Sequence, residues 1–164
     1  MNFLPRRIKH VMKAANIATV ATTMITGFLG KKETGSAASP MNAASQVLWG
    51  NKAAHEDGAD AKHTAAGVGV NAIAMYAWSA VLEGVFGSWV RSADEKGGSP
   101  LARAAVAGAS VSVLAYVADT YVLPKQIAPG GFEKRLSPLA VATTYGVLAA
   151  SLAAGAVWAN RAEA

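Results

Sequence analysis

Four long apolar segments constrain the fold of this chain more than any other feature of its sequence. In chain order they cover residues 12–30, 64–90, 104–123 and 139–158. Each segment is long enough to cross the roughly 30 Å hydrocarbon core of a bilayer at about 1.5 Å per helical residue. A backbone in lipid must satisfy its own hydrogen bonds, so the segments predict an all-α, polytopic membrane bundle with about four transmembrane helices. We expect residues 1–164 to form a single membrane domain.

The composition supports the lipid bilayer as the main solvent of the chain. Hydrophobic residues make up 52% of the sequence and charged residues only 15%, which differs from an ordinary soluble domain. The apolar residues are mostly Ala, Val and Gly, so each helix is mildly hydrophobic and should depend on contacts with other helices. The sequence has no cysteine, which excludes disulfides, cysteine-bound metals and thiol nucleophiles.

The basic residues predict the location and orientation of the bundle. The formal net charge is +5, but Lys and Arg lie in short clusters between apolar segments, which favours interfacial charges over a nucleic-acid partner. One cluster lies at and before the start of the first segment and consists of Arg6, Arg7, Lys9 and Lys13. By the positive-inside rule, we expect a multi-pass membrane protein with both termini in the cytoplasm.

The first apolar segment has an alternative interpretation as a cleaved signal peptide. It follows a basic stretch, and the small residues Ser36, Ala37 and Ala38 offer a cleavage site after it. We expect the segment to be retained as the first helix.

Residues 31–63 form the longest polar loop between two apolar segments. The loop contains one apolar patch, Val47-Leu48-Trp49. A Trp beside such a patch is typical of a short helix that lies on the membrane, so we expect an interfacial helix here.

Stripes of small and polar residues are predicted to line the interior of the bundle. Helices in lipid gain packing where small residues let their backbones approach closely. At 100° per residue, the stripes are Gly69, Ala72, Tyr76, Ser79, Glu83 and Gly87 in the second helix, Gly108, Ser112, Ala115 and Asp119 in the third, and Ala142, Gly146, Ala150 and Ala153 in the fourth.

Two polar residues interrupt the second apolar segment, Asn71 and Glu83. Glu83 lies eight residues before Arg91, roughly 12 Å inside the helix end, where an unpaired carboxylate costs about 2.5 kcal/mol or more. The carboxyl group must therefore be neutral or partnered. It is either a functional proton or cation site, or a protonated group that hydrogen-bonds a neighbouring helix.

Asp119 interrupts the third segment five residues before Pro124, close to the opposite membrane face. We expect a structural ion pair that keeps this carboxylate ionised. The candidate partners are His63, Lys125, Lys134 and Arg135.

One group of residues in the first loop has the spacing of metal ligands. On a helix, Glu56, Asp60 and His63 would share one face, with His55 nearby. The sequence contains no phosphate-binding loop, dinucleotide fingerprint, nucleophile elbow or zinc-protease motif. We therefore expect no cofactor and regard an enzyme as the weaker class.

Several short motifs occur in a characteristic order over about residues 40–155. They are PMNAAS (40–45), LWG (48–50), HTAAG (63–67), DTYVLPK (119–125) and PGGFEKRLS (129–137). In this order they resemble a family of uncharacterised proteobacterial four-helix inner-membrane proteins. The resemblance implies no activity, and it implies that the recurring residues Trp49, His63, Asp119, Lys125, Glu133 and Arg135 border the first and third loops. The sequence departs from the family pattern in the extra glycine of PGGF and in the lack of His residues in the second helix.

Three functions are consistent with the sequence. We expect a noncatalytic accessory or structural subunit that packs against partner helices, in a complex with other membrane proteins or in a homo-oligomer. An alternative is a small proton- or ion-coupled transporter or channel component that uses Glu83. A further alternative is a metal-dependent membrane enzyme.

Overall fold

The computed structural model of the protein describes residues 4–124 and 131–161. Within these ranges, every regular element is helical. The long helices are α1 (Arg6–Thr34), α4 (Thr64–Arg91), α5 (Pro100–Val117) and α6 (Pro138–Arg161). The short elements are α2 (Ser39–Ala44), α3 (Gln46–Trp49), the 3₁₀ turns Ala53–His55, Asp94–Lys96 and Phe132–Lys134, and a π-helical turn, Ala118–Val122, that continues α5.

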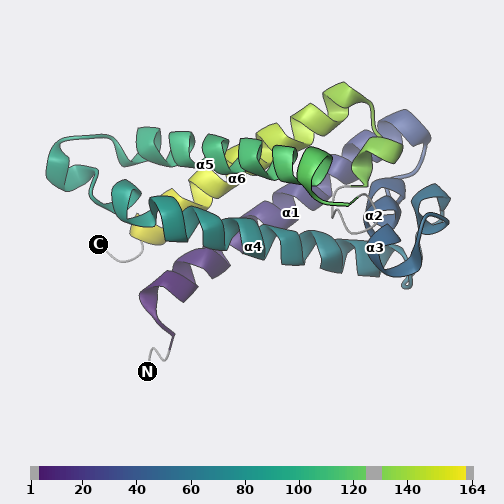
Figure 1. The fold of residues 1–164 in the computed structure, drawn as a ribbon, viewed down its shortest axis with the longest axis horizontal. Coiled ribbons are helices and arrows are strands. Elements are labelled where there is room, and N and C mark those ends of the chain that lie inside the picture. Colours follow the sequence, from purple (N-terminus) through teal and green to yellow (C-terminus); the bar gives the residue numbers. More distant parts are fainter. Residues whose placement is uncertain (1–3, 125–130, 162–164) are drawn as a thin grey trace.

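The four long helices run alternately up and down and form a closed bundle (Figure 1). Around the bundle, α1 contacts α4, α4 contacts α5, α5 contacts α6, and α6 contacts α1 again. The turn between α4 and α5 lies at the same end as the chain termini, and we call this the terminal end. The loops of residues 35–63 and 131–137 lie at the other end, the loop end.

Three helices are long and apolar enough to cross a membrane: α4, α5 with its π-helical extension to Val122, and α6. They coincide with the predicted second, third and fourth spans. The prediction of an all-α bundle is confirmed for the described residues, and these three helices have the length and composition that a crossing requires. Helix α1 has 29 residues, but it carries more Lys and Thr than the other long helices. A crossing by α1 stays a prediction.

Small residues bring α6 close to both of its neighbours. A Cβ at Gly155 would lie 2.5 Å from the Ala14 Cα of α1, and a Cβ at Gly108 would lie 2.4 Å from the Ala149 carbonyl oxygen of α6. The α1 residues Ala14, Ala15 and Ala18 are fully buried. The backbones therefore pack so closely that a Cβ atom at either of these two glycines would clash with the neighbouring helix.

The predicted interior stripe is confirmed in α5 but only partly in α4. In α5, Gly108, Ser112 and Ala115 are buried. In α4, Ser79 and Gly87 are buried as expected, whereas Gly69 and Tyr76 are exposed. Their places are taken by Gly67, Asn71, Met75 and Leu82, because α4 turns this face towards α1 and α2.

The predicted interior stripe of α6 is wrong for three of its four residues. Ala142, Gly146 and Ala150 are exposed, and the bulky residues Leu148 and Leu152 behind them are buried. Because α1 and α5 present small residues to α6, the centre of the bundle has room for large side chains. Leu148 and Leu152 fill that room, and the small residues Ala142, Gly146 and Ala150 face outwards.

The first loop folds into a cap rather than a single interfacial helix. All six residues of α2 are buried, and the Asn42 amide donates to the carbonyl oxygens of Glu56 and Gly58 at 2.9 and 2.8 Å. The Thr64 hydroxyl donates to the Asn42 side-chain oxygen at 2.7 Å. One asparagine therefore ties the loop to the start of α4.

Glu33 joins the end of α1 to the start of α6. Its carboxylate accepts hydrogen bonds from the Ser137 hydroxyl at 2.6 Å and from the Ser137 backbone N–H at 2.7 Å. These two bonds hold the pKa of Glu33 below its ordinary value, since they stabilise the charged form.

A pair of Gly→Ala substitutions tests the packing of α6. We expect Gly108→Ala to destabilise the bundle by about 1–3 kcal/mol, because the new methyl group meets the α6 backbone. We expect Gly146→Ala to be neutral or stabilising by up to about 1 kcal/mol, since no atom lies within 4 Å of its Cβ position. Reversible unfolding in mixed micelles, followed by circular dichroism, measures both. Equal effects would contradict the packing.

The Glu33 interaction predicts a pH dependence of stability. Because the pKa is lowered in the folded state, the stabilisation is present above the ordinary value of 4.5 and is lost as the pH falls through the lowered value. We expect Glu33→Gln to unfold at a lower temperature than the wild type at pH 7, and the difference to shrink below about pH 4.5. The exposed Glu95 supplies the control, Glu95→Gln, whose difference from the wild type should not show this dependence.

Candidate functional site

Glu83 forms an ion pair at the terminal end of the bundle. Arg91, two turns later in α4, donates to Glu83 Oε1 at 2.6 Å. The Nδ1 atom of His10 in α1 lies 3.5 Å from Glu83 Oε2. Gly87 lies between the two charged residues of α4, and a Cβ there would be 2.6 Å from Glu83 Oε2. The carboxylate is therefore partnered, as one of the expected alternatives requires, and its neighbour belongs to the basic start of α1.

Aromatic and basic side chains gather at the same end. Lys13 Nζ lies 5.4 Å from the ring centroid of Trp158, and the Arg103 guanidinium lies 5.4 Å from that of Trp89. Such pairs are typical of the membrane–water interface. Glu83 lies at the end of the bundle that carries these pairs.

Asn71 connects α4 to α1 within the bundle. Its buried amide donates to the hydroxyls of Thr22 and Thr23 at 3.0 and 3.2 Å. Tyr76 makes a further contact by donating to Asn16 at 2.8 Å. These bonds satisfy polar groups between helices, so Asn71 has a structural role in the fold.

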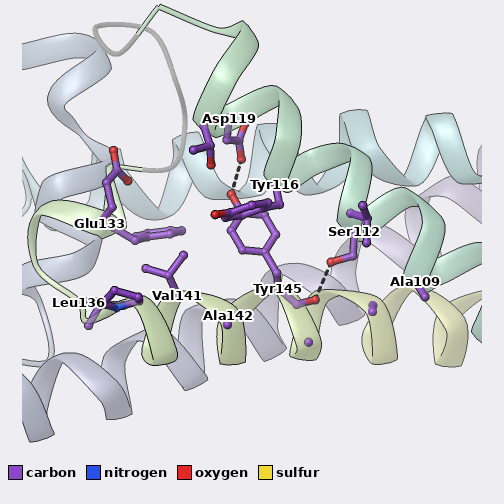
Figure 2. A pocket seen from close by; sticks show the side chains of 15 residues that line it. Ala109, Ser112, Tyr116, Asp119, Glu133, Leu136, Val141, Ala142 and Tyr145 are labelled. Atoms are coloured by element: carbon purple, nitrogen blue, oxygen red, sulfur yellow. Dashed lines mark hydrogen bonds between the residues drawn. The ribbon is translucent and has the colours of Figure 1, made fainter.

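Asp119 does not form the predicted ion pair with His63, Lys134 or Arg135. The Tyr145 hydroxyl of α6 donates to Asp119 Oδ2 at 2.7 Å (Figure 2). Among the residues that the structure describes, Asp119 Oδ1 is buried and has no hydrogen-bond partner. The proposed partner Lys125 lies outside the described residues.

The three described basic candidates bind other groups in the loops. His63 contacts Asp60 at 2.9 Å, Arg135 contacts Asp57, and Lys134 donates to the side-chain oxygens of Gln46 and Asn51. In the folded cap, these acidic and amide side chains lie closer to the three basic side chains than Asp119 does. The loop charges therefore stabilise the cap and do not reach the third helix.

A groove of about 600 Å³ runs between α5 and α6 from Asp119 towards the middle of both helices. Ala142, Gly146 and Ala149 of α6 face Ala109 and Val113 of α5 across it. Figure 2 shows Asp119, Tyr116 and Tyr145 gathered at one end, with Glu133 opposite them. The groove thus has apolar walls and an acidic, aromatic end.

Two contacts determine the shape of this groove. The Ser112 hydroxyl donates to the Tyr145 carbonyl oxygen at 2.6 Å and joins the two helices at its floor. The rings of Tyr116 and Tyr145 meet edge to face, with centroids 5.3 Å apart. The π-helical turn Ala118–Val122 follows directly, and such turns are frequent at functional sites because they change the direction of the helix end.

The expected metal ligands do not gather. Residues 56–63 do not form a helix, and of the four candidates only Asp60 and His63 are in contact. Hydrogen bonds from the His63 side chain and backbone N–H hold the pKa of Asp60 below its ordinary value. In the described part of the chain, no three His, Asp or Glu side chains are placed to share a metal ion.

The remaining loop candidate, Trp49, lies at the edge of the cap. Its indole N–H donates to the Lys62 carbonyl oxygen at 3.1 Å, and the Lys62 Nζ lies 4.9 Å from the ring centroid. It does not contact Asp119 or the groove. Trp49 therefore closes the first loop on itself.

Sequence reasoning missed Tyr145 as a site residue. Tyr145 lies outside the small-residue stripe that helical periodicity predicts for α6, and no local pattern indicates that its hydroxyl reaches Asp119. No protein-family model, curated protein or solved structure matches this chain. The functional argument therefore depends on the geometry of the groove.

The Glu83 ion pair gives a prediction about stability. We expect Arg91→Gln to destabilise the bundle by roughly 1–3 kcal/mol, because the Glu83 carboxyl group loses the hydrogen bond from Arg91. The double variant Glu83→Gln/Arg91→Gln should recover most of this loss, since no charge is then buried. Unfolding in mixed micelles measures both variants. A single variant as stable as the wild type would show that the pair contributes nothing.

Proposed function

We propose that the protein is a noncatalytic four-span protein of the bacterial inner membrane that binds a hydrophobic guest in the groove between α5 and α6. The observation that carries the proposal is the groove itself. Its volume of about 600 Å³ lies within the range of about 300–1,000 Å³ that small-molecule sites occupy. Val113 and Gly146 along it are exposed, so a guest in the acyl-chain region has direct access from the side.

Helix α1 is the fourth span in this proposal. It packs against both α4 and α6, and it buries Ala14, Ala15, Ala18, Thr22 and Thr26 in the bundle. Asn16, Thr22 and Thr26 of α1 have hydrogen-bond partners inside the protein, which favours a crossing despite the low hydropathy of the helix. The basic residues at its start favour a cytoplasmic terminal end, and the acidic end of the groove then lies on the outer side.

Helix α3 is the part of the first loop that we assign to the membrane interface. Leu48 and Trp49 are exposed side by side, and Lys62 lies over the Trp ring. Apolar, aromatic and basic groups in one place are typical of the interfacial region.

An accessory subunit is the second candidate, and the exposed stripe of small residues on α6 favours it. Ala142, Gly146 and Ala149 would let the backbone of a partner helix approach closely. In that case the guest in the groove is a transmembrane helix of another subunit or of a second copy. Ion transport through Glu83 has less support, because Arg91 and His10 already contact that carboxylate.

Native mass spectrometry of protein released gently from membranes tests the proposed function. We expect the wild type to retain a guest of lipid-like mass, and Ala142→Phe to lose it because the ring fills the groove. The matched control is Ala150→Phe, since Ala150 is also exposed on α6 but does not line the groove. Retention of a protein subunit by the wild type, lost in Ala142→Phe, would replace the proposal with the accessory subunit. Identical spectra for all three proteins, with no bound mass, would overturn it.

A further inference from the structure

We propose that the guest of the α5–α6 groove is a cationic amphiphile with a protonated primary amine as its head group and one hydrocarbon chain as its body. This inference rests on the proposed function, and it names the chemistry that the groove selects. The amine lies against Asp119 and Glu133, and the hydrocarbon chain extends along α5 and α6.

At the acidic end of the groove, one carboxylate oxygen of Asp119 lacks a hydrogen-bond donor among the described residues. The other oxygen accepts a hydrogen bond from the Tyr145 hydroxyl. Glu133 places a second carboxylate at the same end. A buried acceptor without a donor is unfavourable, and an ammonium group supplies both the N–H and the positive charge. A charge-assisted bond of this kind is stronger than a neutral one.

The aromatic residues suit the same head group. Tyr116 and Tyr145 line the groove beside Asp119, and the buried ring of Phe132 lies at its border. Aromatic rings attract ammonium groups through their negative faces. Carboxylates and rings together therefore favour a cation over a neutral or anionic head.

The lining of the groove also argues against a head group that carries phosphate. None of the residues that line it in the described part of the chain is Lys, Arg or His. A phosphate would bring negative charge beside Asp119 and Glu133 without a basic partner among the described lining residues. A simple amine avoids this repulsion, whereas an aminophospholipid does not.

The dimensions and direction of the groove suit a single chain. From Ala109 to Thr120, α5 advances roughly 16 Å along the groove wall. The wall is built of small side chains, so it leaves space for methylene groups. The acidic end lies at the loop end of the bundle, so a guest has its head near the membrane surface and its chain towards the centre. A molecule already oriented in that leaflet enters sideways without turning over.

Photolabelling tests this inference on the full chain in phosphatidylcholine nanodiscs at pH 7. The probe is dodecylamine with a diazirine at the end of its chain, and the labelled residues are mapped by mass spectrometry. We expect labelling along the α5–α6 groove near Ala109 and Ala149, and competition by dodecylamine. Dodecanol, dodecyl sulfate, dodecyltrimethylammonium and a short-chain phosphatidylethanolamine should compete about tenfold less well or not at all.

Two variants and one control connect the binding to the acidic end. Asp119→Asn and Glu133→Gln should each weaken labelling about tenfold or more. Glu133→Gln should leave folding unchanged because Glu133 is exposed. Glu95→Gln, in the turn at the terminal end, should label like the wild type. Retained helicity in circular dichroism identifies the variants that remain folded.

The outcomes separate this inference from the proposed function. Equal competition by dodecanol or dodecyl sulfate would show that the groove binds apolar chains without distinguishing their head groups. This result would overturn the inference of an amine head group and leave the proposed function in place. Equal competition by the quaternary amine would overturn the hydrogen bond to Asp119, and equal competition by phosphatidylethanolamine would make the guest a phospholipid. No specific labelling of the groove by the probe, together with no retained mass in the native spectrum, would overturn both proposals.

Discussion

The close contact of α6 with α1 and α5 determines much of this structure. At Gly155 the backbone of α6 meets Ala14, and at Gly108 the backbone of α5 meets Ala149. These contacts fix the rotation of α6 about its axis, because only one orientation presents Gly155 to α1 while Leu148 and Leu152 fill the centre. The same rotation turns Ala142 and Gly146 outwards. The groove is therefore a consequence of tight packing elsewhere in the bundle.

Glu83 in α4 and Asp119 at the end of α5 differ in whether a basic residue in the described part of the chain contacts the carboxylate. Glu83 is held by Arg91 of its own helix and lies beside His10 of α1, so its charge is compensated within the protein. Asp119 receives one hydrogen bond from a neutral hydroxyl, and its other oxygen has no donor among the described residues. Since a carboxylate in a groove of low polarity favours a cation, Asp119 is the acid that we propose to bind the guest.

The charged residues of the loops stabilise the cap at the loop end of the bundle. Arg135 contacts Asp57, and Glu33 binds Ser137 across the ends of α1 and α6. These contacts hold residues 131–137 against the first loop and the end of α1. His63, Lys134 and Arg135 bind other groups in the cap, which explains why these three bases do not neutralise Asp119.

The sequence by itself determined the class of the fold. Long apolar runs in a helical backbone predict the bundle, and the predicted spans of α4, α5 and α6 agree with the structure because hydropathy and helix length are local properties. It also identified Asp119, Glu83 and Asn71 as the residues to examine, since polar groups in apolar segments are conspicuous. Only the tertiary structure decided which partner each of them has and which face of α6 is buried. Pairing depends on residues far apart in the chain, as with Asp119 and Tyr145, and helix rotation depends on the shapes of all neighbours at once. The groove arises from both, so no local pattern in the sequence predicts it.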